Sequence, residues 1–437
     1  MTRIWNKFIP LDKKLSNGTS KQFHPVRNSR LSNGAGAPLK PHTSSLPQYH
    51  SKAGYGAQRG RRKVFVAMSG GVDSSLSAAL LKEQGYDVTG IFIKVWQPDF
   101  VECVWKEERL DAMRVCARLG IKFLTLDLEK EYKKEVVDYM ISEYKAGRTP
   151  NPDVNCNKYV KFGAFFDFAM KSGADYVATG HYARLRREFP ISKSQFLNKS
   201  EILNSKIQTI YKLLEASDKN KDQSYFLWNL TQEHLKRTLF PIGNMQKTEV
   251  RKIARKFNLP VFDKKDSQGL CFIGKVDMKD FLKHYLPTKK GNVLNEEGEI
   301  IGWHEGAYFY TTGQRHGFII TKKSSEDKPY YVISKDTLSN AITVSHSPAT
   351  QGISSSKKIT ISGTNWIAGE LPDFSKKYKA RIRYRGHLQA CGIEMAEGKN
   401  LKFSIVFDLP QAAVSRGQSL VIYDGEHCIG GGVIDNF

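Results

Sequence analysis

The sequence predicts an α/β fold with a parallel sheet in its first half, a small and mostly helical part in the middle, and an antiparallel β-barrel at the end. From Val64 to about Leu230, short apolar runs alternate with helical stretches, which is the pattern of β-α units. The loop Ser69–Ser74 joins an apolar run to a helix through two glycines. Beyond about Gly291, β-branched and aromatic runs are punctuated by glycines, which favours antiparallel strands.

The first half is expected to hold four strands with helices between them. Leu76, Ala79 and Leu80 recur at helical spacing after the loop, and Gly85 is placed to end that helix. Parallel sheets bind ligands at the carboxyl ends of their strands, which is where the Ser69–Ser74 loop lies. The expected strands are 64–67, 88–93, 122–127 and 176–179, and the expected helices are 74–84, 107–118, 130–145 and 158–171.

The rest of the chain is organised differently. Val250, Ile253, Ala254 and Phe257 fall on one helical face, with Arg251, Lys252, Arg255 and Lys256 outside it. The polar stretch 192–205 is interpreted as a surface insertion. Strands are expected at 308–312, 330–334, 341–345, 358–362, 401–407 and 420–423. The predicted parts are a basic leader at 1–63, a nucleotide-binding domain at 64–230, a central domain at 231–290 and the barrel at 291–437.

The net charge points to a polyanionic partner. The 437-residue chain has a formal charge of +23 and an isoelectric point near 9.6, and part of the excess is local. Residues 1–63 contain thirteen Lys and Arg residues against the single acid Asp12. We interpret this leader as a mitochondrial transit segment with a flexible linker, the alternative being a basic tail. No apolar run is as long as a membrane-spanning helix.

The loop Ser69–Ser74 has the composition of a phosphate-binding loop. Two glycines let backbone N–H groups turn inward, and the helix that follows contributes its positive end. The loop has neither the lysine of the Walker A pattern nor the glycine spacing of the Rossmann fingerprint. Phosphate binding is favoured over a plain turn before a surface helix.

The six cysteines are scattered, with no C-x-x-C pair and no zinc spacing, which favours a reducing compartment and argues against a structural metal. Cys156 follows two prolines near an expected helix start at 157 or 158, where N–H groups lower a thiol pKa. Asp153 lies three residues earlier and could hold or move a proton. Cys271 lies in a loop with glycines on both sides. The alternative is a helix cap and two packed cysteines.

Cationic and polar motifs indicate contacts with nucleic acid. Gly180 and His181 follow the strand at 176–179 and so reach the edge of the phosphate loop. Lys221–Phe226 offers a charged group to phosphates. The residues Lys379, Arg381, Arg383 and Arg385 alternate with apolar ones, which would place four cations on one strand face. We favour a bound polyanion there over a solvated edge strand.

Taken together, these motifs resemble one family, the tRNA-specific 2-thiouridylases, and in particular their mitochondrial members. The resemblance covers roughly residues 64–437. It implies a PP-loop adenine-nucleotide α-hydrolase-like (Rossmann-like) domain, a small central domain and a C-terminal β-barrel. The matching segments, in the family's order, are Ser69–Ser74, Asn151–Asp153 with Cys156, Ala178–Tyr182, Lys221–Tyr225, Gly269–Gly274 and Arg383–Arg385.

The resemblance also implies a reaction. ATP, with Mg²⁺, adenylates the C2 oxygen of the wobble uridine (position 34), and sulfur from a persulfide on Cys271 then displaces AMP. Cys156 is implied to be a nucleophile that ends in a disulfide with Cys271, while Asp153 is placed to act as general base. Hydrosulfide release and direct persulfide attack both remain open. The expected partners are tRNA and a sulfur-donor protein, with no membrane and a monomeric chain.

The family's binding roles fall on two groups of residues. Ile93 stands where a methionine is associated with the adenine pocket. The residues implied to bind ATP are Ala67, Met68, Ser69, Gly70, Gly71, Val72, Asp73, Ser74, Ile93 and Gly180. Those implied to contact the target base or the tRNA are Asn151, Pro152, Asp153, His181, Lys221, Asp222, Gln223, Arg383, Tyr384 and Gln418.

Two other functions fit parts of the pattern. Another PP-loop enzyme that adenylates a carboxylate or amide would explain the loop, but it would need neither reactive cysteines nor a cationic strand. An RNA-binding protein without catalytic activity would explain the charge and leave the double-glycine loop unexplained. Pyrophosphate release that depends on tRNA separates the three.

Overall fold

The computed structural model describes residues 61–101, 105–188, 209–266, 277–321, 328–347, 355–396 and 402–437. The predicted leader (apart from residues 61–63), the insertion at 192–205 and Cys271 with its glycines lie outside these ranges. Within them, no helix is both long enough and apolar enough to cross a membrane.

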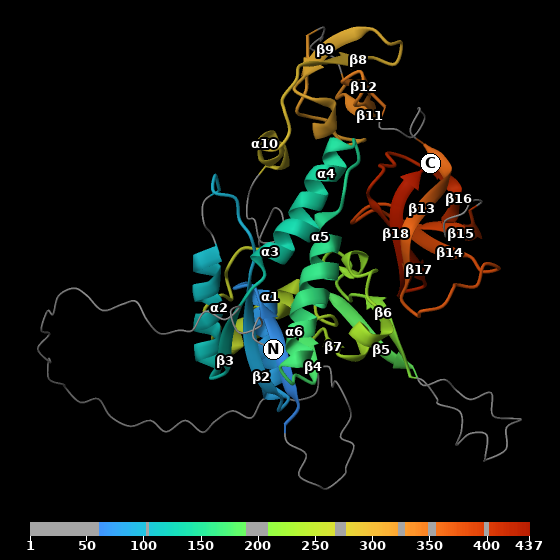
Figure 1. Ribbon diagram of the computed structural model, residues 1–437. Coiled ribbons are helices and arrows are strands. Elements are labelled where there is room, and N and C mark those ends of the chain that lie inside the picture. The colour runs from blue at the N-terminus through green and yellow to red at the C-terminus, as the bar shows by residue number, and fades with distance from the viewer. Residues whose placement is uncertain are drawn as a thin grey trace, which may run out of the picture. The chain divides into compact units, whose positions relative to one another are not determined.

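A five-stranded parallel sheet forms the first part of the chain, in the order β3-β2-β1-β4-β7 (Figure 1). The four predicted strands are confirmed. The fifth comes from the segment that was expected to be mostly helical. Val64 and Val66 have no exposed surface, as expected for a strand covered on both faces. The strands are β1 (Lys63–Met68), β2 (Asp87–Lys94), β3 (Lys122–Asp127), β4 (Tyr176–Ala178) and β7 (Thr238–Leu239).

The predicted helices of this part are present, two of them with π-helical segments inside. The first helix ends as predicted, because Gly85 follows its cap with φ of +88°, a conformation that glycine adopts without strain. The helices are α1 (Val72–Glu83), α2 (Trp105–Leu119), the run of α3 (Glu129–Tyr132), π-helix Lys133–Asp138 and α4 (Tyr139–Lys145), and the run of α5 (Pro152–Asn155), π-helix Cys156–Ala164 and α6 (Phe165–Lys171).

The middle of the chain is short helices, as expected. In α9 (Lys247–Lys256), Val250 and Ala254 are buried, so the predicted apolar face is confirmed. Two further strands lie earlier in the chain, within residues 64–230. They are β5 (Ala183–Glu188) and β6 (Ile210–Glu215), which pair with each other, and β6 also pairs with β18 and so extends the sheet of the C-terminal barrel. The other helices are α8 (Gln232–Lys236) and α10 (Met278–Lys283).

Residues 291–345 form a five-stranded sheet of their own, in the order β10-β9-β8-β12-β11. The β-rich part therefore contains two sheets and not a single barrel. The strand expected at 308–312 is wrong, because Ala307–Phe309 is a turn of 3₁₀ helix. The strands are β8 (Gly291–Leu294), β9 (Ile300–His304), β10 (Ile319–Ile320), β11 (Tyr331–Asp336) and β12 (Ala341–Ser345).

The predicted C-terminal barrel is confirmed. Six antiparallel strands follow one another around it, and the pairing of β13 with β18 closes it. Ile359, Ile405 and Phe403 lie in its buried core. The strands are β13 (Ser356–Trp366), β14 (Tyr378–Arg381), β15 (Gln389–Met395), β16 (Phe403–Gln411), β17 (Ser419–Asp424) and β18 (His427–Asn436).

The predicted row of four cations on one strand face is wrong. Strand β14 ends at Arg381, so Arg383 and Arg385 lie in the turn that follows it, where both are exposed. Arg381 is buried, with 7% of its surface exposed, and pairs with Glu215. The alternation of cations and apolar residues continues in the sequence beyond the end of the strand, and the backbone is no longer extended at Arg385, where φ is +59°.

Candidate active site

A cavity of about 460 Å³ opens at the carboxyl ends of β1, β2 and β4. Met68 ends β1, Ile93 is near the end of β2, and Thr179 follows β4. Open parallel sheets bind ligands at this edge. The predicted residues that line the cavity are Ala67, Met68, Ser69, Gly71, Val72, Asp73, Ser74, Ile93, Asp153, Gly180, His181, Lys221, Gln223 and Tyr384.

Most of the loop Ser69–Ser74 lines this cavity, and the loop leads directly into α1. Gly70 has φ of +72°, and a Cβ atom there would lie 2.3 Å from the carbonyl oxygen of Glu108. No side chain caps the start of α1 at Gly71, so the first N–H groups of the helix are not taken by a capping side chain. The Ser74 hydroxyl fixes the loop, at 3.2 Å from both the Ser69 nitrogen and the Gly71 oxygen.

Gly180 serves the packing of this loop. A Cβ atom on Gly180 would lie 2.6 Å from the backbone nitrogen of Ser74. The space that glycine provides is therefore taken by the first turn of α1. We expected it to admit a nucleotide, and the residue also lines the cavity.

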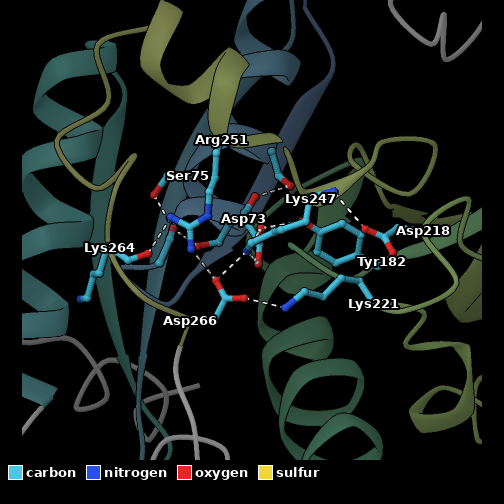
Figure 2. A network of polar contacts seen from close by, with 12 residues as sticks. Asp73, Ser75, Tyr182, Asp218, Lys221, Lys247, Arg251, Lys264 and Asp266 are labelled. Atoms are coloured by element: carbon cyan, nitrogen blue, oxygen red, sulfur yellow. Dashed lines mark hydrogen bonds and ion pairs between the residues drawn. The ribbon is translucent and has the colours of Figure 1, made fainter. Parts of the chain in front are cut away.

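Charged side chains from distant segments meet around Asp73, at the start of α1 (Figure 2). Asp73, in the first turn of α1, accepts a hydrogen bond from the Tyr182 hydroxyl at 2.9 Å. The Lys247 ammonium lies 2.8 Å from each Asp73 oxygen and 2.8 Å from Asp266 Oδ1. Lys247 thus joins the start of α9 to the start of α1.

Asp266 is the centre of this cluster. Lys221 Nζ lies 2.6 Å from its Oδ2, and Arg251 lies 3.0 Å from its Oδ1. Burial alone would raise the pKa of Asp266, but the hydrogen bonds from Lys221 and Lys247 outweigh burial and hold the pKa at about 2. Asp266 is therefore an anion over the whole physiological range.

Lys264 contacts the phosphate loop directly. Its ammonium lies 3.2 Å from the carbonyl oxygen of Gly70 and 2.8 Å from Asp111 Oδ2. Neither Lys264 nor Lys247 could be found from the sequence, because no local motif connects them with a loop almost two hundred residues earlier. The helical pattern also placed Arg251 on a solvated face, whereas Arg251 donates to the carbonyl oxygens of Phe262 and Lys264.

The segment with Asp153 and Cys156 begins a helix earlier than expected. Asn151 is the N-cap, accepting from the Val154 nitrogen at 3.3 Å, and Pro152 is the first helical residue. Cys156 is therefore one turn inside the helix and has no exposed surface. The expectation of a thiol at the helix N-terminus is wrong. Asp153 lines the cavity, whereas Cys156 does not.

The barrel holds the chain just before this helix. The Gln418 amide donates to the carbonyl oxygens of Thr149 and Pro150, at 3.0 and 3.2 Å. The Thr149 nitrogen donates to the Arg416 oxygen at 2.8 Å. In this structure Gln418 is a contact between the barrel and the start of α5.

Asp222 has an internal role. It is 3% exposed and accepts from the Ala216 nitrogen at 2.9 Å and from the Ser224 hydroxyl at 3.0 Å. Arg381 lies 3.4 Å from it. Burial raises the pKa of Asp222, while the backbone hydrogen bonds from Ala216 and Ser224 and the charge of Arg381 act against burial. The tRNA contact predicted for Asp222 would require this site to open.

Two predicted neighbours of the substrate differ in exposure. His181 is 7% exposed, and burial, with Lys161 adding to it, keeps its pKa well below the ordinary value, so the ring is neutral. Its Nδ1 lies 2.8 Å from the Thr179 hydroxyl. Tyr384 is half-buried, and its ring centre lies 4.4 Å from that of Phe226, which also lines the cavity.

Comparison with known proteins gives matches along the chain. Residues 62–275 match the model described as the tRNA methyl transferase HUP domain. Residues 279–346 match the tRNA methyl transferase PRC-barrel domain, and residues 356–434 match the aminomethyltransferase beta-barrel domain. The tRNA-specific 2-thiouridylase MnmA of Geobacillus thermodenitrificans is 43% identical over 375 residues, which cover 85% of this chain and 94% of that protein. The chain belongs to the tRNA-specific 2-thiouridylase family.

Other 2-thiouridylases agree with this. The protein of Shewanella amazonensis is 44% identical over 87% of this chain and 96% of its own length. That of Christiangramia forsetii is 42% identical over 85% of this chain and its own full length. The U34-tRNA thiolase NcsA of Methanococcus maripaludis covers 52% of this chain with 19% identity and a TM-score of 0.30, which is too low to support an argument.

The donor set available to this 2-thiouridylase does not form a metal cage. Among the residues that the structure describes, no group of three His, Cys, Asp or Glu side chains could hold a metal ion. Asp73 and Glu108 are carboxylates that line the cavity near the loop. A magnesium ion that arrives with a nucleotide keeps its phosphate and water ligands and needs one or two such carboxylates.

Proposed function

We propose that this protein is an ATP-dependent sulfurtransferase that converts the wobble uridine of tRNA, at position 34, to 2-thiouridine. One observation supports this above the others. The phosphate loop, Asp153 and the aromatic pair Phe226 and Tyr384 line the same cavity, so a nucleotide and a base can be held against each other. The relatives named above are called tRNA-specific 2-thiouridylases.

In the first step, the C2 oxygen of the uridine attacks the α-phosphorus of ATP. The bond from that phosphorus to the bridging oxygen breaks, and pyrophosphate leaves with the electron pair. The N3 proton of the uridine passes to a base, for which Asp153 is our candidate because its side chain lines the cavity. An amide-like oxygen is a poor leaving group, and adenylation turns it into a good one.

Asp73 would be a magnesium ligand in this step, since its carboxylate stands in the first turn after the loop. Mg²⁺ would supply charge neutralisation on the phosphates. The first N–H groups of α1, which no side chain caps, attract phosphate without any metal.

In the second step, sulfur replaces AMP. A persulfide on Cys271 holds sulfur at the S⁰ level, so two electrons must be supplied. If the Cys156 thiolate attacks the Sγ atom of Cys271, the S–S bond of the persulfide breaks, hydrosulfide leaves and a Cys156–Cys271 disulfide forms. The hydrosulfide then adds to C2 of the adenylated uridine, and AMP leaves with the electron pair of its bond to C2. If the persulfide attacks C2 first, AMP leaves, and Cys156 then cleaves the S–S bond to give the same disulfide. Either way an external reductant, a thiol, restores both cysteines.

The base must leave its stack to reach this cavity. Extruding a base costs a few kcal/mol and least from a single-stranded loop, which fits an anticodon position. Tyr384 and Phe226 offer aromatic faces on which an unstacked base can lie. Exposed cations at Arg383 and Arg385 are suited to the RNA backbone.

The test uses the full chain with unmodified tRNA, ATP and a persulfide donor. We expect pyrophosphate release that depends on tRNA, and 2-thiouridine at position 34 by mass spectrometry. We expect acceptors of the Lys, Glu and Gln type. Pyrophosphate release with ammonia or an amino acid in place of tRNA would favour a synthetase, and tRNA binding without any turnover would favour an RNA-binding protein.

We also propose that the protein works in mitochondria. The argument is the composition of residues 1–63, with thirteen cations and one acid. Fusing this segment to a fluorescent reporter should direct the reporter to mitochondria, and replacing its arginines and lysines by glutamine should abolish import. A reporter that stays in the cytosol with both the natural and the substituted segment would contradict the mitochondrial location, without bearing on the proposed reaction.

A further inference from the structure

Lys264 supplies a cation at a loop whose own sequence has no lysine. Its ammonium lies 3.2 Å from the Gly70 carbonyl oxygen, and its side chain is 33% exposed and lines the cavity. Phosphate loops of the Walker type carry their lysine within the loop. Here a lysine reaches the glycine loop from a segment that follows α9.

The backbone of Lys264 is held in place by the cluster around Asp266. Arg251 donates to the carbonyl oxygens of Phe262 and Lys264, at 3.2 and 3.0 Å, and also pairs with Asp266. Lys247 and Lys221 pair with the same carboxylate (Figure 2). A short segment that makes this many charged contacts is fixed against the loop, so the ammonium of Lys264 is positioned before any ligand arrives.

The ion pair that Lys264 makes in this structure is weak enough to be replaced by a contact with a phosphate. Asp111 Oδ2 lies 2.8 Å from the ammonium, with both side chains partly exposed. Such partly exposed pairs contribute at most about 1 kcal/mol, whereas a charged hydrogen bond to a polyphosphate in a partly desolvated cavity is stronger. Lys247 differs, because its side chain is 12% exposed, it does not line the cavity and it holds two carboxylates.

We propose that Lys264 is the phosphate-binding lysine of this site, contacting the β- or γ-phosphate of ATP and stabilising the charge on departing pyrophosphate. The inference rests on the proposed function for the identity of the nucleotide. Lys247 is a positioning residue that keeps Asp73 and Asp266 in place. The two lysines therefore differ in a measurable way, since AMP has no β- or γ-phosphate.

The test measures the affinities of the full chain for ATP, inorganic pyrophosphate and AMP by calorimetry. Lys264→Met should weaken the affinities for ATP and pyrophosphate by roughly tenfold or more, as expected for loss of a charged hydrogen bond. The affinity for AMP should change less than threefold. Lys264→Arg should recover most of the ATP affinity. Lys247→Met should weaken the affinities for ATP and AMP alike, because it disturbs the loop itself.

The matched control is Lys252→Met, an exposed lysine of α9 outside the cavity, which should leave all three affinities unchanged. If removal of the Lys264 charge unfolds the chain, the double variant Asp111→Asn with Lys264→Met removes the pair together and takes its place. Unchanged ATP affinity in Lys264→Met, or an equal loss of ATP and AMP affinity, overturns the proposal. Wild-type protein that binds no ATP would instead contradict the proposed function.

Discussion

The Gln418 side chain, on the barrel, donates from its amide to the carbonyl oxygen of Thr149 at 3.0 Å. Thr149 lies two residues before the cap of the helix that holds Asp153 and Cys156. A residue of the last domain thus fixes the approach to the proposed catalytic helix. We therefore expect the barrel to act on the proposed chemistry by positioning this helix, besides any contact with tRNA.

Gln418→Leu should therefore lower the thiolation rate without weakening the binding of ATP. Misplacement by about 1 Å can cost up to about a hundredfold in rate, and we expect a loss of about tenfold in kcat. ATP affinity should stay within twofold, because Gln418 contacts no residue of the loop Ser69–Ser74. Single-turnover thiolation and ATP titration measure the two.

The control for this variant is Gln389→Leu, on β15 of the same barrel. A Gln418→Leu protein whose defect is entirely a weaker tRNA affinity, with unchanged kcat at saturating tRNA, would contradict the positioning role. It would support the direct tRNA contact that the sequence predicts.

The charge of Asp266 gives a pH-dependent prediction. Its pKa is held at about 2, below the ordinary 3.8, so the folded state binds this proton less tightly than the unfolded state. The carboxylate therefore stabilises the fold above about pH 4, and the contribution is lost as the pH falls towards 2. Asp266→Asn should be less stable than wild type at pH 7, and the difference should shrink as acid is added.

Urea unfolding at several pH values measures this difference. Asp263→Asn, an exposed acid three residues earlier, is the control and should parallel the wild type throughout. A difference between Asp266→Asn and wild type that is constant from pH 7 to pH 3 would mean that the ion pairs with Lys221 and Lys247 are not its source.

The parallel sheet and the loop could be predicted from sequence because their signals are local. Strand 122–127 is confirmed at both ends as β3, since its short apolar run lies between two stretches with helical periodicity, which is the local signal of a β-α unit. Of the barrel strands, β13, β16 and β17 match expected strands, whereas β15 and β18 were not expected. The residues that complete the site could not be predicted, because Lys264 and Lys247 come to the loop only through packing of α9 on α1, which no local periodicity records.

Two misjudged motifs have the same physical cause. Alternation predicted a strand through Arg385, but the turn after Arg381 has no hydrophobic signature of its own. Prolines at 150 and 152 predicted an extended entry, yet Pro152 starts a helix, where its missing N–H costs nothing. In both cases the backbone changes at residues whose types are compatible with either structure.

The buried pair of Arg381 and Glu215 should be important for stability. Both side chains are less than a tenth exposed, and Asp222 lies 3.4 Å from Arg381. Removing one partner of a buried pair leaves a charge without its counter-ion and typically costs about 3 to 5 kcal/mol. Arg381→Met should lose stability of this order in chemical denaturation, whereas Lys379→Met, exposed on the same strand, should lose almost none.

The Arg381→Met variant also tests whether Arg381 faces the interior, as in the structure, or lies in a row of exposed cations, as the sequence predicts. If Arg381→Met retains wild-type stability but loses tRNA affinity as strongly as Arg383→Met does, then Arg381 faces the RNA and not the interior. We expect the reverse, with Arg383→Met weakening tRNA binding and leaving the free energy of unfolding unchanged.

Cys156 should be protected from alkylation in the free protein. Its side chain has no exposed surface, and thiol reagents attack the exposed thiolate. Iodoacetamide applied to the native chain should leave Cys156 unlabelled, as it should the equally buried Cys116 and Cys428. Peptide mass spectrometry after a short pulse identifies each labelled cysteine. In denaturant all of them should react.

In the proposed mechanism, turnover requires that Cys156 become accessible, because disulfide formation with Cys271 needs a thiolate that can reach it. The π-helical segment beginning at Cys156 is a geometry often found where helices adjust at functional sites. Binding of tRNA with ATP should therefore raise the labelling rate of Cys156 and leave that of Cys116 unchanged. Rapid labelling of Cys156 in the free protein would show that the thiol is already accessible, and that the substrate has no part in exposing it.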